Sequence, residues 1–291
     1  MIDFDYQAPT QLDEALDLLK QHGDDARAIA GGTALVIMMK QRLVQPQVLV
    51  SLRRIPGLDD VRSDNGALHL GATATHRAVE TAPVVRERWP LLAETYRHVA
   101  TVRIRNMATV GGGIVHGDPN QDPPPALIAL GAKARLRSGS GEREVPLESF
   151  FLDYYETDVQ PGEVLTEIVV PEQPRDAGWA WVKFLPRTAD DYATVSVACL
   201  VTLENGSNRC RDARIALGSA ATTPVRADAA EAALRGQELT PERLREAAQL
   251  VAGQVDPISD FRGSSDYKRD MAVVWTRRAL EQALQRARGG A

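Results

Sequence analysis

Apolar residues recur along residues 12–19 with the i, i+3, i+4, i+7 spacing of one buried helix face. Thr10 is a residue type that caps helix N-termini and Gly23 is one that ends helices, so we expect the helix to lie between them. Short apolar runs over 26–30 and 47–52 predict two strands on either side of a second helical segment. A strand, a helix and a further strand in this order predict a small parallel sheet.

From about residue 61 the pattern changes to short strands separated by turn residues, with helices between them. Strand-like runs cover 68–72, 133–137 and 164–170, and an Asn-Gly turn at 65–66 precedes the first of them. This alternation predicts a second unit built on a different sheet. A Pro- and Gly-containing stretch over 171–178 indicates a linker after it.

Three β-rich stretches follow the linker, at 179–185, 194–204 and 213–218. The remaining chain has a helical pattern. Thr223-Pro224 and Thr240-Pro241 are typical helix starts, and a long last helix is predicted over 271–288. The sequence therefore predicts an α+β protein of three units: an α/β unit over 1–60, a second unit over 61–175, and a three-stranded sheet with helices over 176–291.

Composition excludes several classes of function. The 291 residues are 44% apolar and 25% charged, which is typical of a folded globular protein and not of a disordered one. The formal net charge of −5 gives no general attraction to nucleic acid or to an anionic membrane surface. No apolar run approaches a membrane span, and no basic segment precedes an apolar one at the acidic N-terminus, so we expect a cytoplasmic protein.

The chain contains two cysteines, Cys199 and Cys210. Two are too few for a zinc or iron–sulfur site with four thiolate ligands, and we interpret both as reduced thiols in strands. The five histidines show no metal-binding spacing either. We therefore expect no metal site in this chain, and any redox centre must be organic or belong to a partner.

Two glycine segments are candidates for binding an anion. In the first, a strand runs into Gly31 and Gly32, and a Met- and Leu-rich helix over 34–43 follows. Glycines at a strand–helix turn place several N–H groups at a helix N-terminus, where a phosphate is favoured, although a tight turn alone explains the two glycines equally well. The second segment, Thr109 followed by Val110 and then three glycines at 111–113, predicts another such nest of N–H groups.

Asp118 and Asp122 follow the second glycine segment and could accept hydrogen bonds from sugar hydroxyls, or could simply cap the next helix. The glycine patterns of a Rossmann NAD site and of a P-loop are both absent. A dinucleotide would therefore need its pyrophosphate held between two separate loops.

A third candidate stretch runs from Lys183 to Ala193, between two predicted strands. Tyr192, which follows Asp190 and Asp191, could stack on a planar ring, and the basic residues of the stretch could meet phosphate or carbonyl oxygens. An ordinary polar hairpin connection is the alternative.

At these three stretches the sequence resembles the FAD-binding medium subunit of molybdenum hydroxylases, the group of carbon monoxide dehydrogenase and xanthine dehydrogenase. The most specific pieces are AGGTALVIMMKQRL and ATVGGGIVHGDPNQDPPPALIALGA, and VLTEIVVP and Asp191-Tyr192-Ala193 match in order and spacing. The resemblance implies FAD as cofactor and a two-part FAD-binding domain of the vanillyl-alcohol-oxidase-like type, a small α/β piece plus an antiparallel-sheet piece.

The resemblance also implies roles for individual residues. Both glycine segments would grip the FAD pyrophosphate, Asp122 would contact the ribityl or ribose region, Leu165 would pack near the adenine, and Tyr192 would lie over the isoalloxazine. No side chain would act as a catalytic acid or base. The implied cofactor-binding residues are Ala30, Gly31, Gly32, Thr33, Ala34, Leu35, Thr109, Gly111, Gly112, Gly113, Asp118, Asp122, Leu165, Lys183, Asp191 and Tyr192. Gly113 stands where the family usually has Asn, so one side-chain hydrogen bond is missing or replaced.

In such an enzyme a large molybdopterin-binding subunit and a small subunit with 2Fe–2S clusters would be the partners, and electrons would pass through the clusters to FAD and on to an external acceptor. The two cysteines fit this arrangement, because the metal centres would lie on the other subunits. Two alternatives remain: a stand-alone FAD oxidoreductase of the related fold, and an assembly subunit that has lost FAD.

Overall fold

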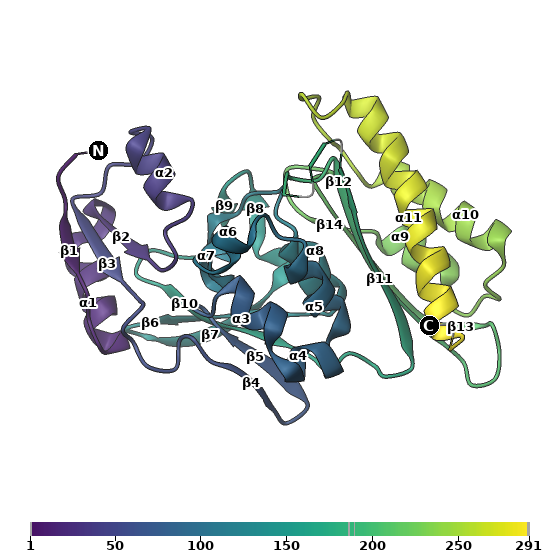
Figure 1. Ribbon diagram of the computed structural model, residues 1–291, viewed down its shortest axis with the longest axis horizontal. Helices are drawn as coiled ribbons and strands as arrows, with labels where there is room; N and C mark the ends of the chain where they lie inside the picture. Colours follow the sequence, from purple (N-terminus) through teal and green to yellow (C-terminus); the bar gives the residue numbers. More distant parts are fainter. Residues whose placement is uncertain (1, 186, 189, 290–291) are drawn as a thin grey trace.

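The computed structural model describes residues 2–185, 187–188 and 190–289, which form three units side by side along the long axis of the molecule (Figure 1). The first unit is a parallel three-stranded sheet in the order β1 (Asp5–Gln7), β3 (Val48–Ser51), β2 (Ala26–Ile29). It carries the helices α1 (Leu12–His22) and α2 (Leu35–Lys40) and the short 3-10 helix η1 (Gly23–Asp25). The parallel sheet predicted from the sequence is confirmed.

The ends of the first helices differ from the prediction. Gln11, not Thr10, is the N-cap residue of α1, and it makes no side-chain capping bond. The backbone N–H of Thr10 instead contacts the Glu14 carboxylate at 3.3 Å. Gly23 ends α1 as expected, whereas α2 is shorter than the predicted 34–43.

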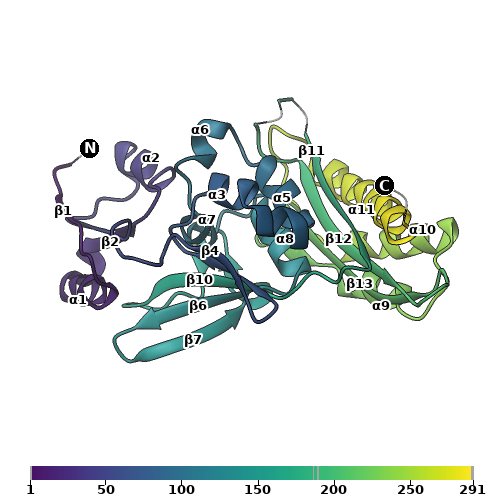
Figure 2. The same cartoon turned by 60° about the horizontal axis from the view of Figure 1, so that its bottom comes forward.

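The second unit is an antiparallel five-stranded sheet in the order β4 (Val61–Asp64), β5 (Ala67–Gly71), β10 (Val164–Val170), β6 (Lys133–Ser138), β7 (Gly141–Pro146). Helices lie on one side of this sheet, as Figure 2 shows. Their bounds are α3 (His76–Thr81), α4 (Pro83–Arg88), α5 (Pro90–Arg97), α6 (Val102–Arg105), α7 (Val110–His116) and α8 (Pro123–Ala129). The 3-10 helix η2 (Leu147–Ser149) and the hairpin of β8 (Phe151–Asp153) and β9 (Glu156–Thr157) complete the unit.

The third unit contains a four-stranded antiparallel sheet within the described residues, so the prediction of three strands is wrong. The order is β11 (Ala177–Phe184), β12 (Val195–Leu203), β13 (Cys210–Gly218), β14 (Val225–Arg226). Thr223-Pro224, which resembles a helix start, leads into β14 instead. The helices are α9 (Asp228–Leu234), α10 (Pro241–Leu250), η3 (Val251–Gly253) and α11 (Ser265–Ala287), and α11 begins six residues before the predicted position.

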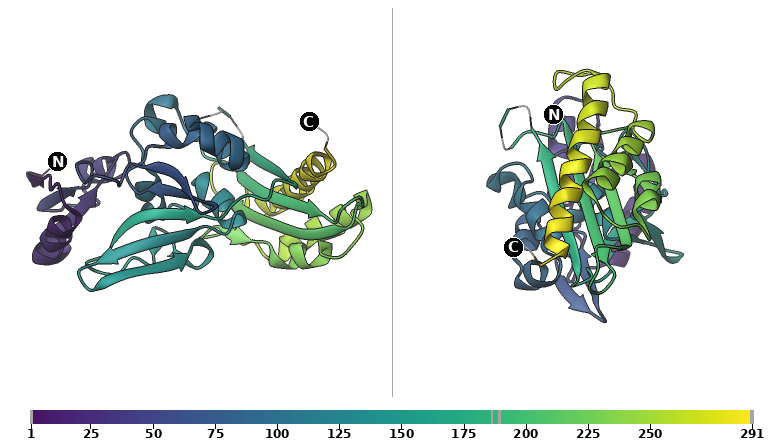
Figure 3. Two further views of the ribbon diagram at one scale, coloured as in Figure 1. Left: turned by 90° about the horizontal axis from the view of Figure 1, so that it is seen from below. Right: turned by 90° about the vertical axis from the view of Figure 1, so that its right-hand side faces the viewer.

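This third sheet is covered on both faces (Figure 3). Ala180, Val197 and Leu280 belong to a core shared with the helices. On the other face, Leu200 and Ala216 join the core of the second unit. Eight of the nine residues of β12 are buried for this reason.

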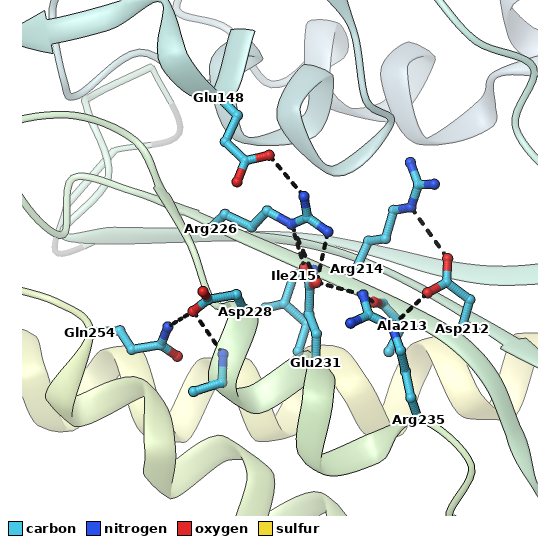
Figure 4. A network of polar contacts seen from close by, with 11 residues as sticks. Glu148, Asp212, Ala213, Arg214, Ile215, Arg226, Asp228, Glu231, Arg235 and Gln254 are labelled. Carbon is cyan, nitrogen blue, oxygen red and sulfur yellow. Dashed lines mark hydrogen bonds and ion pairs between the residues drawn. The ribbon is translucent and has the colours of Figure 1, made fainter. Parts of the chain in front are cut away.

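A polar network also links the second and third units (Figure 4). Glu231 of α9 is fully buried and accepts hydrogen bonds from Arg226, from Arg235 and from the backbone N–H of Ile215. Arg226 reaches on to Glu148 in η2 of the second unit at 2.8 Å. None of the helices that the structure describes is long and apolar enough to cross a membrane.

Candidate functional site

The two glycine segments lie directly against each other. Gly31 follows β2, and a Cβ atom added to it would be 2.1 Å from the backbone oxygen of Met107 and 3.1 Å from Cα of Ala108. No side chain fits into that space, so glycine at this position lets the first unit touch the chain just before Thr109. The fold thus brings the two segments together, as the sequence predicts for a ligand clasped from two loops.

The first segment presents a set of free N–H groups. Gly32 has a φ of +71°, a conformation that favours glycine. The N–H groups of Gly32, Thr33, Ala34 and Leu35 donate to no acceptor among the described residues, because the first intrahelical bond runs from Val36 to the oxygen of Gly32. Ala30 precedes this turn. These donors can bind an anion.

The second segment does not form the open nest that the sequence predicts. The N–H groups of Val110 and Gly111 donate to the oxygens of Ala74 and Ala72, and those of Gly112 and Gly113 donate to the side chain and backbone of Thr109. Gly111 is required for packing, since a Cβ on it would lie 2.6 Å from Cβ of Ala72. Only the exposed Gly112 N–H, held by Thr109 Oγ1 at 3.2 Å, is placed to exchange its partner for a ligand.

Asp122 and Lys183 form a buried ion pair at the junction of the second and third units. Lys183 Nζ lies 2.8 Å from Oδ2 of Asp122 and donates a second hydrogen bond to the oxygen of His98. Asp122 Oδ1 is buried and has no hydrogen-bond partner among the described residues. Burial raises the pKa of Asp122 to about 6, and the Lys183 charge opposes this shift. An acceptor without a partner in a buried site fits a ligand hydroxyl.

Tyr192 stands beside Asp118 in the loop between β11 and β12, in which Pro186 and Ala189 lie outside the described residues. Burial and then the Asp118 carboxylate raise the pKa of Tyr192 above its ordinary value, so its hydroxyl stays protonated. The ring remains partly exposed, which leaves area for stacking.

Arg262, from the segment before α11, holds this loop and was not found from the sequence. Its Nη2 donates to Asp191 Oδ1 at 3.1 Å, and the same oxygen accepts the backbone N–H of Tyr192 at 2.7 Å. The hydrogen bond from Arg262 holds the pKa of Asp191 below its usual range. Asp190 is exposed. No local pattern marks Arg262, because it lies 70 residues beyond Tyr192 in the chain.

Two further residues near the second glycine segment were also missed, because no pattern of residue types marks either of them. His76 is buried, its Nε2 lies 3.2 Å from the oxygen of Thr109, and burial lowers its pKa to about 4, so its ring is neutral. Gln121 donates from Nε2 to the oxygen of Gly113 at 2.9 Å. Leu165 is one of the residues that the resemblance implies for the cofactor. It is buried in β10, the strand beside α7.

Comparison with known proteins agrees with this geometry. Residues 2–173 match the family described as the FAD binding domain in molybdopterin dehydrogenase, and residues 180–283 match the CO dehydrogenase flavoprotein C-terminal domain. The chain belongs to the FAD-binding medium subunits of molybdenum hydroxylases. It is therefore an FAD protein and a subunit of an oxidoreductase.

Similar members of this family span nearly the whole chain. The carbon monoxide dehydrogenase medium chain of Hydrogenophaga pseudoflava is 38% identical over 97% of this chain and 98% of its own length. The nicotine 6-hydroxylase medium subunit of Paenarthrobacter nicotinovorans is 34% identical over 96% of each chain. Among solved structures, carbon monoxide dehydrogenase from Hydrogenophaga pseudoflava superposes with a TM-score of 0.94 at 40% identity, over 98% of this chain and 99% of the other.

The residues present fit FAD. The four free N–H groups that begin α2 suit the charge of a pyrophosphate, and the unpartnered Oδ1 of Asp122 suits a sugar or ribityl hydroxyl. Both cysteines are buried thiols, and burial raises the pKa of Cys199 to about 12 and of Cys210 to about 11, so neither is a reactive thiolate. No cluster of metal-binding side chains occurs within the described residues.

Proposed function

We propose that this chain carries electrons through a bound FAD, from 2Fe–2S clusters on a small partner subunit to an external acceptor, in a complex with a large molybdopterin-binding subunit. The contact of Gly31 with Met107, which joins the two glycine segments, is the observation that carries the proposal. The names of the relatives support the partners, since each is a medium chain or subunit of a larger enzyme.

The first glycine segment, from Ala30 to Leu35, holds the pyrophosphate through backbone N–H groups. When the cofactor binds, the hydrogen bond from the Gly112 N–H to the Thr109 hydroxyl would break. Both groups would then donate to the pyrophosphate from the side opposite the first glycine segment. Gly111 keeps α7 packed against the chain at Ala72. Because these donors are uncharged, they bind the phosphates without a nearby cation that would shift the flavin potential.

Asp122 accepts a hydrogen bond from a cofactor hydroxyl through Oδ1, while Lys183 keeps the carboxylate ionised and in place. Tyr192 covers one face of the ring system, and Asp118 and Asp191 fix its ring and its backbone. Leu165 would pack near the adenine, and Gly113 would lie beside the cofactor. The bound flavin supplies the electron chemistry, and no side chain of this chain is needed as an acid or base.

We also propose that the first two units, 1–60 and 61–175, are the two parts of an FAD-binding domain of the vanillyl-alcohol-oxidase-like type, and that 176–291 is a separate C-terminal domain. The small parallel sheet and the antiparallel sheet with helices on one side support this division. The stand-alone oxidase alternative would need an acid–base pair beside the ring. Asp118 is tied to Asn120 and Asp122 to Lys183, which disfavours such a role for them.

The proposal is tested by purifying the tagged chain from its own cells and measuring flavin, iron and molybdenum per chain. We expect one FAD, released as FAD on denaturation, together with iron and molybdenum in the co-purified subunits. A colourless chain that cannot be reconstituted with FAD would contradict the proposal.

A glycine substitution tests the placement of FAD. In Gly31→Ala the new methyl group would collide with the Met107 oxygen and push the two segments apart, so we expect FAD retention to fall by at least about tenfold. Gly139→Ala is the matched control, because a Cβ there meets nothing within 4 Å. Equal flavin content in both variants would show that FAD binds elsewhere.

A further inference from the structure

Gln121 occupies the space toward which a side chain at position 113 would point. A Cβ atom added to Gly113 would lie 2.8 Å from Oε1 of Gln121 and 3.6 Å from Nε2 of His76. Glycine at position 113 therefore leaves the space that the Gln121 amide fills. A larger residue at 113 would have to displace the end of the Gln121 side chain.

The Gln121 amide is held in a fixed orientation. The helix α7 ends with a bond from Gly117 to Ile114, which leaves the oxygen of Gly113 free at the C-terminal end of the helix. Gln121 Nε2 donates to this oxygen at 2.9 Å, and the Gln121 backbone N–H donates to the oxygen of Asp118 at 3.2 Å. With Nε2 used, Oε1 is the acceptor of this amide, and it receives no hydrogen bond from the described residues.

The surroundings of Oε1 indicate a ligand. The next residue, Asp122, has a buried carboxylate oxygen without a partner among the described residues. Gly112, one position before Gly113, is exposed and carries the exchangeable N–H. These three polar groups lie on α7 and on the segment between α7 and α8, which the hydrogen bond from Gln121 to Gly113 joins.

We propose that Gln121 is an FAD-binding residue, and that its Oε1, in the space that a side chain at position 113 would occupy, accepts a hydrogen bond from a hydroxyl or ring N–H of the cofactor. The inference rests on the proposed function, because it requires FAD to run along α7. The inference assigns this contact with the cofactor to a residue that lies eight positions after Gly113.

The test measures the dissociation constant of FAD for the full-length chain after FAD removal, by the quenching of flavin fluorescence. Gln121→Ala is expected to raise the dissociation constant about tenfold, the equivalent of one hydrogen bond. Gln249→Ala, at an exposed position of α10, is the control and should leave it unchanged. Thermal unfolding of the FAD-free variants, measured separately, shows whether Gln121→Ala also alters the fold.

A swap of the two positions makes the test specific. Gly113→Asn alone places its Cβ against Gln121 and should also weaken FAD binding, whereas Gly113→Asn combined with Gln121→Ala should restore it to within about threefold of the parent chain. A loss in Gln121→Ala that the double variant does not recover, or no loss at all, overturns the inference. If Gly31→Ala also retains FAD, the placement of the cofactor itself is wrong.

Discussion

At the scale of single residues, Asp122 is expected to make the stability of the FAD-free chain depend on pH. Its pKa in the folded protein is about 6, above the ordinary value of 3.8, so the folded state binds the proton more tightly than the unfolded state. Protonation of Asp122 therefore stabilises the fold, and this stabilisation is present at pH 4 and is lost as the pH rises to 6.

The Asp122→Asn variant removes this titration. We expect the free energy of unfolding of the parent chain, relative to the variant, to be about 2 kcal/mol higher at pH 4.5 than at pH 7. Urea unfolding of both proteins at the two pH values measures the difference. A difference that stays constant would mean that Lys183 holds the folded-state pKa of Asp122 near its ordinary value.

The two glycine segments show which roles of single residues could be predicted from the sequence. The first segment behaves as its pattern predicts, because the unpaired N–H groups of a helix start follow from local geometry alone. The second segment has the same composition, but Ala72 and Ala74 use two of its donors. Those partners come from a distant loop, so no local pattern could show that Gly111 serves packing while Gly112 is exposed.

At the scale of elements, Thr109 and Thr240 allow the structural and binding roles of a helix cap to be separated. Each side chain accepts the N–H of the third residue after it, Gly112 in α7 and Arg243 in α10. Loss of either cap should lower the free energy of unfolding of the FAD-free chain by about 1 kcal/mol. Only Thr109→Ala should also weaken FAD binding, because only Thr109 belongs to a glycine segment that we propose to hold FAD.

Urea unfolding and FAD titration of Thr109→Ala and Thr240→Ala make this comparison. If the two variants bind FAD equally well, the Thr109 hydroxyl serves the helix alone.

Elements with strong periodicity could be predicted from the sequence, whereas the ends of several helices could not. The run over 164–170 is β10 to the residue, and the linker after it separates the second and third sheets. The short strand β14 was missed, because two residues carry no periodicity and its position depends on pairing with Ala216 and Leu217. Likewise, α11 begins after a Ser264 cap, before its predicted position. Polar residues follow this cap, so apolar spacing does not show where the helix begins.

At the scale of the whole molecule, the third sheet couples the C-terminal unit to the FAD-binding units. Leu200 and Ala216 contribute to the core of the second unit, so the third unit cannot unfold without exposing that core. Arg226 and Glu148 add one ion pair across the same junction, but both are partly exposed, and such a pair contributes at most about 1 kcal/mol. Apolar contact therefore accounts for most of the coupling.

Glu231 provides the test of this coupling. It is fully buried, and its removal would leave the Ile215 N–H without an acceptor and take one partner each from Arg226 and Arg235, so Glu231→Ala should lower the free energy of unfolding by about 2–3 kcal/mol. The control Glu246→Ala removes only an exposed partner of Arg243 and should cost less than about 0.5 kcal/mol.

The two units should respond to Glu231→Ala together, although the substitution lies only in the third. In hydrogen exchange, amides of β10 in the second unit and of β13 in the third should lose protection by the same amount, because the two strands share one unfolding transition. Loss of protection confined to β13 would show that the C-terminal unit unfolds alone. In that case the core contacts of Leu200 and Ala216 would be too weak to transmit the change, and a damaged C-terminal unit would leave the first two units intact.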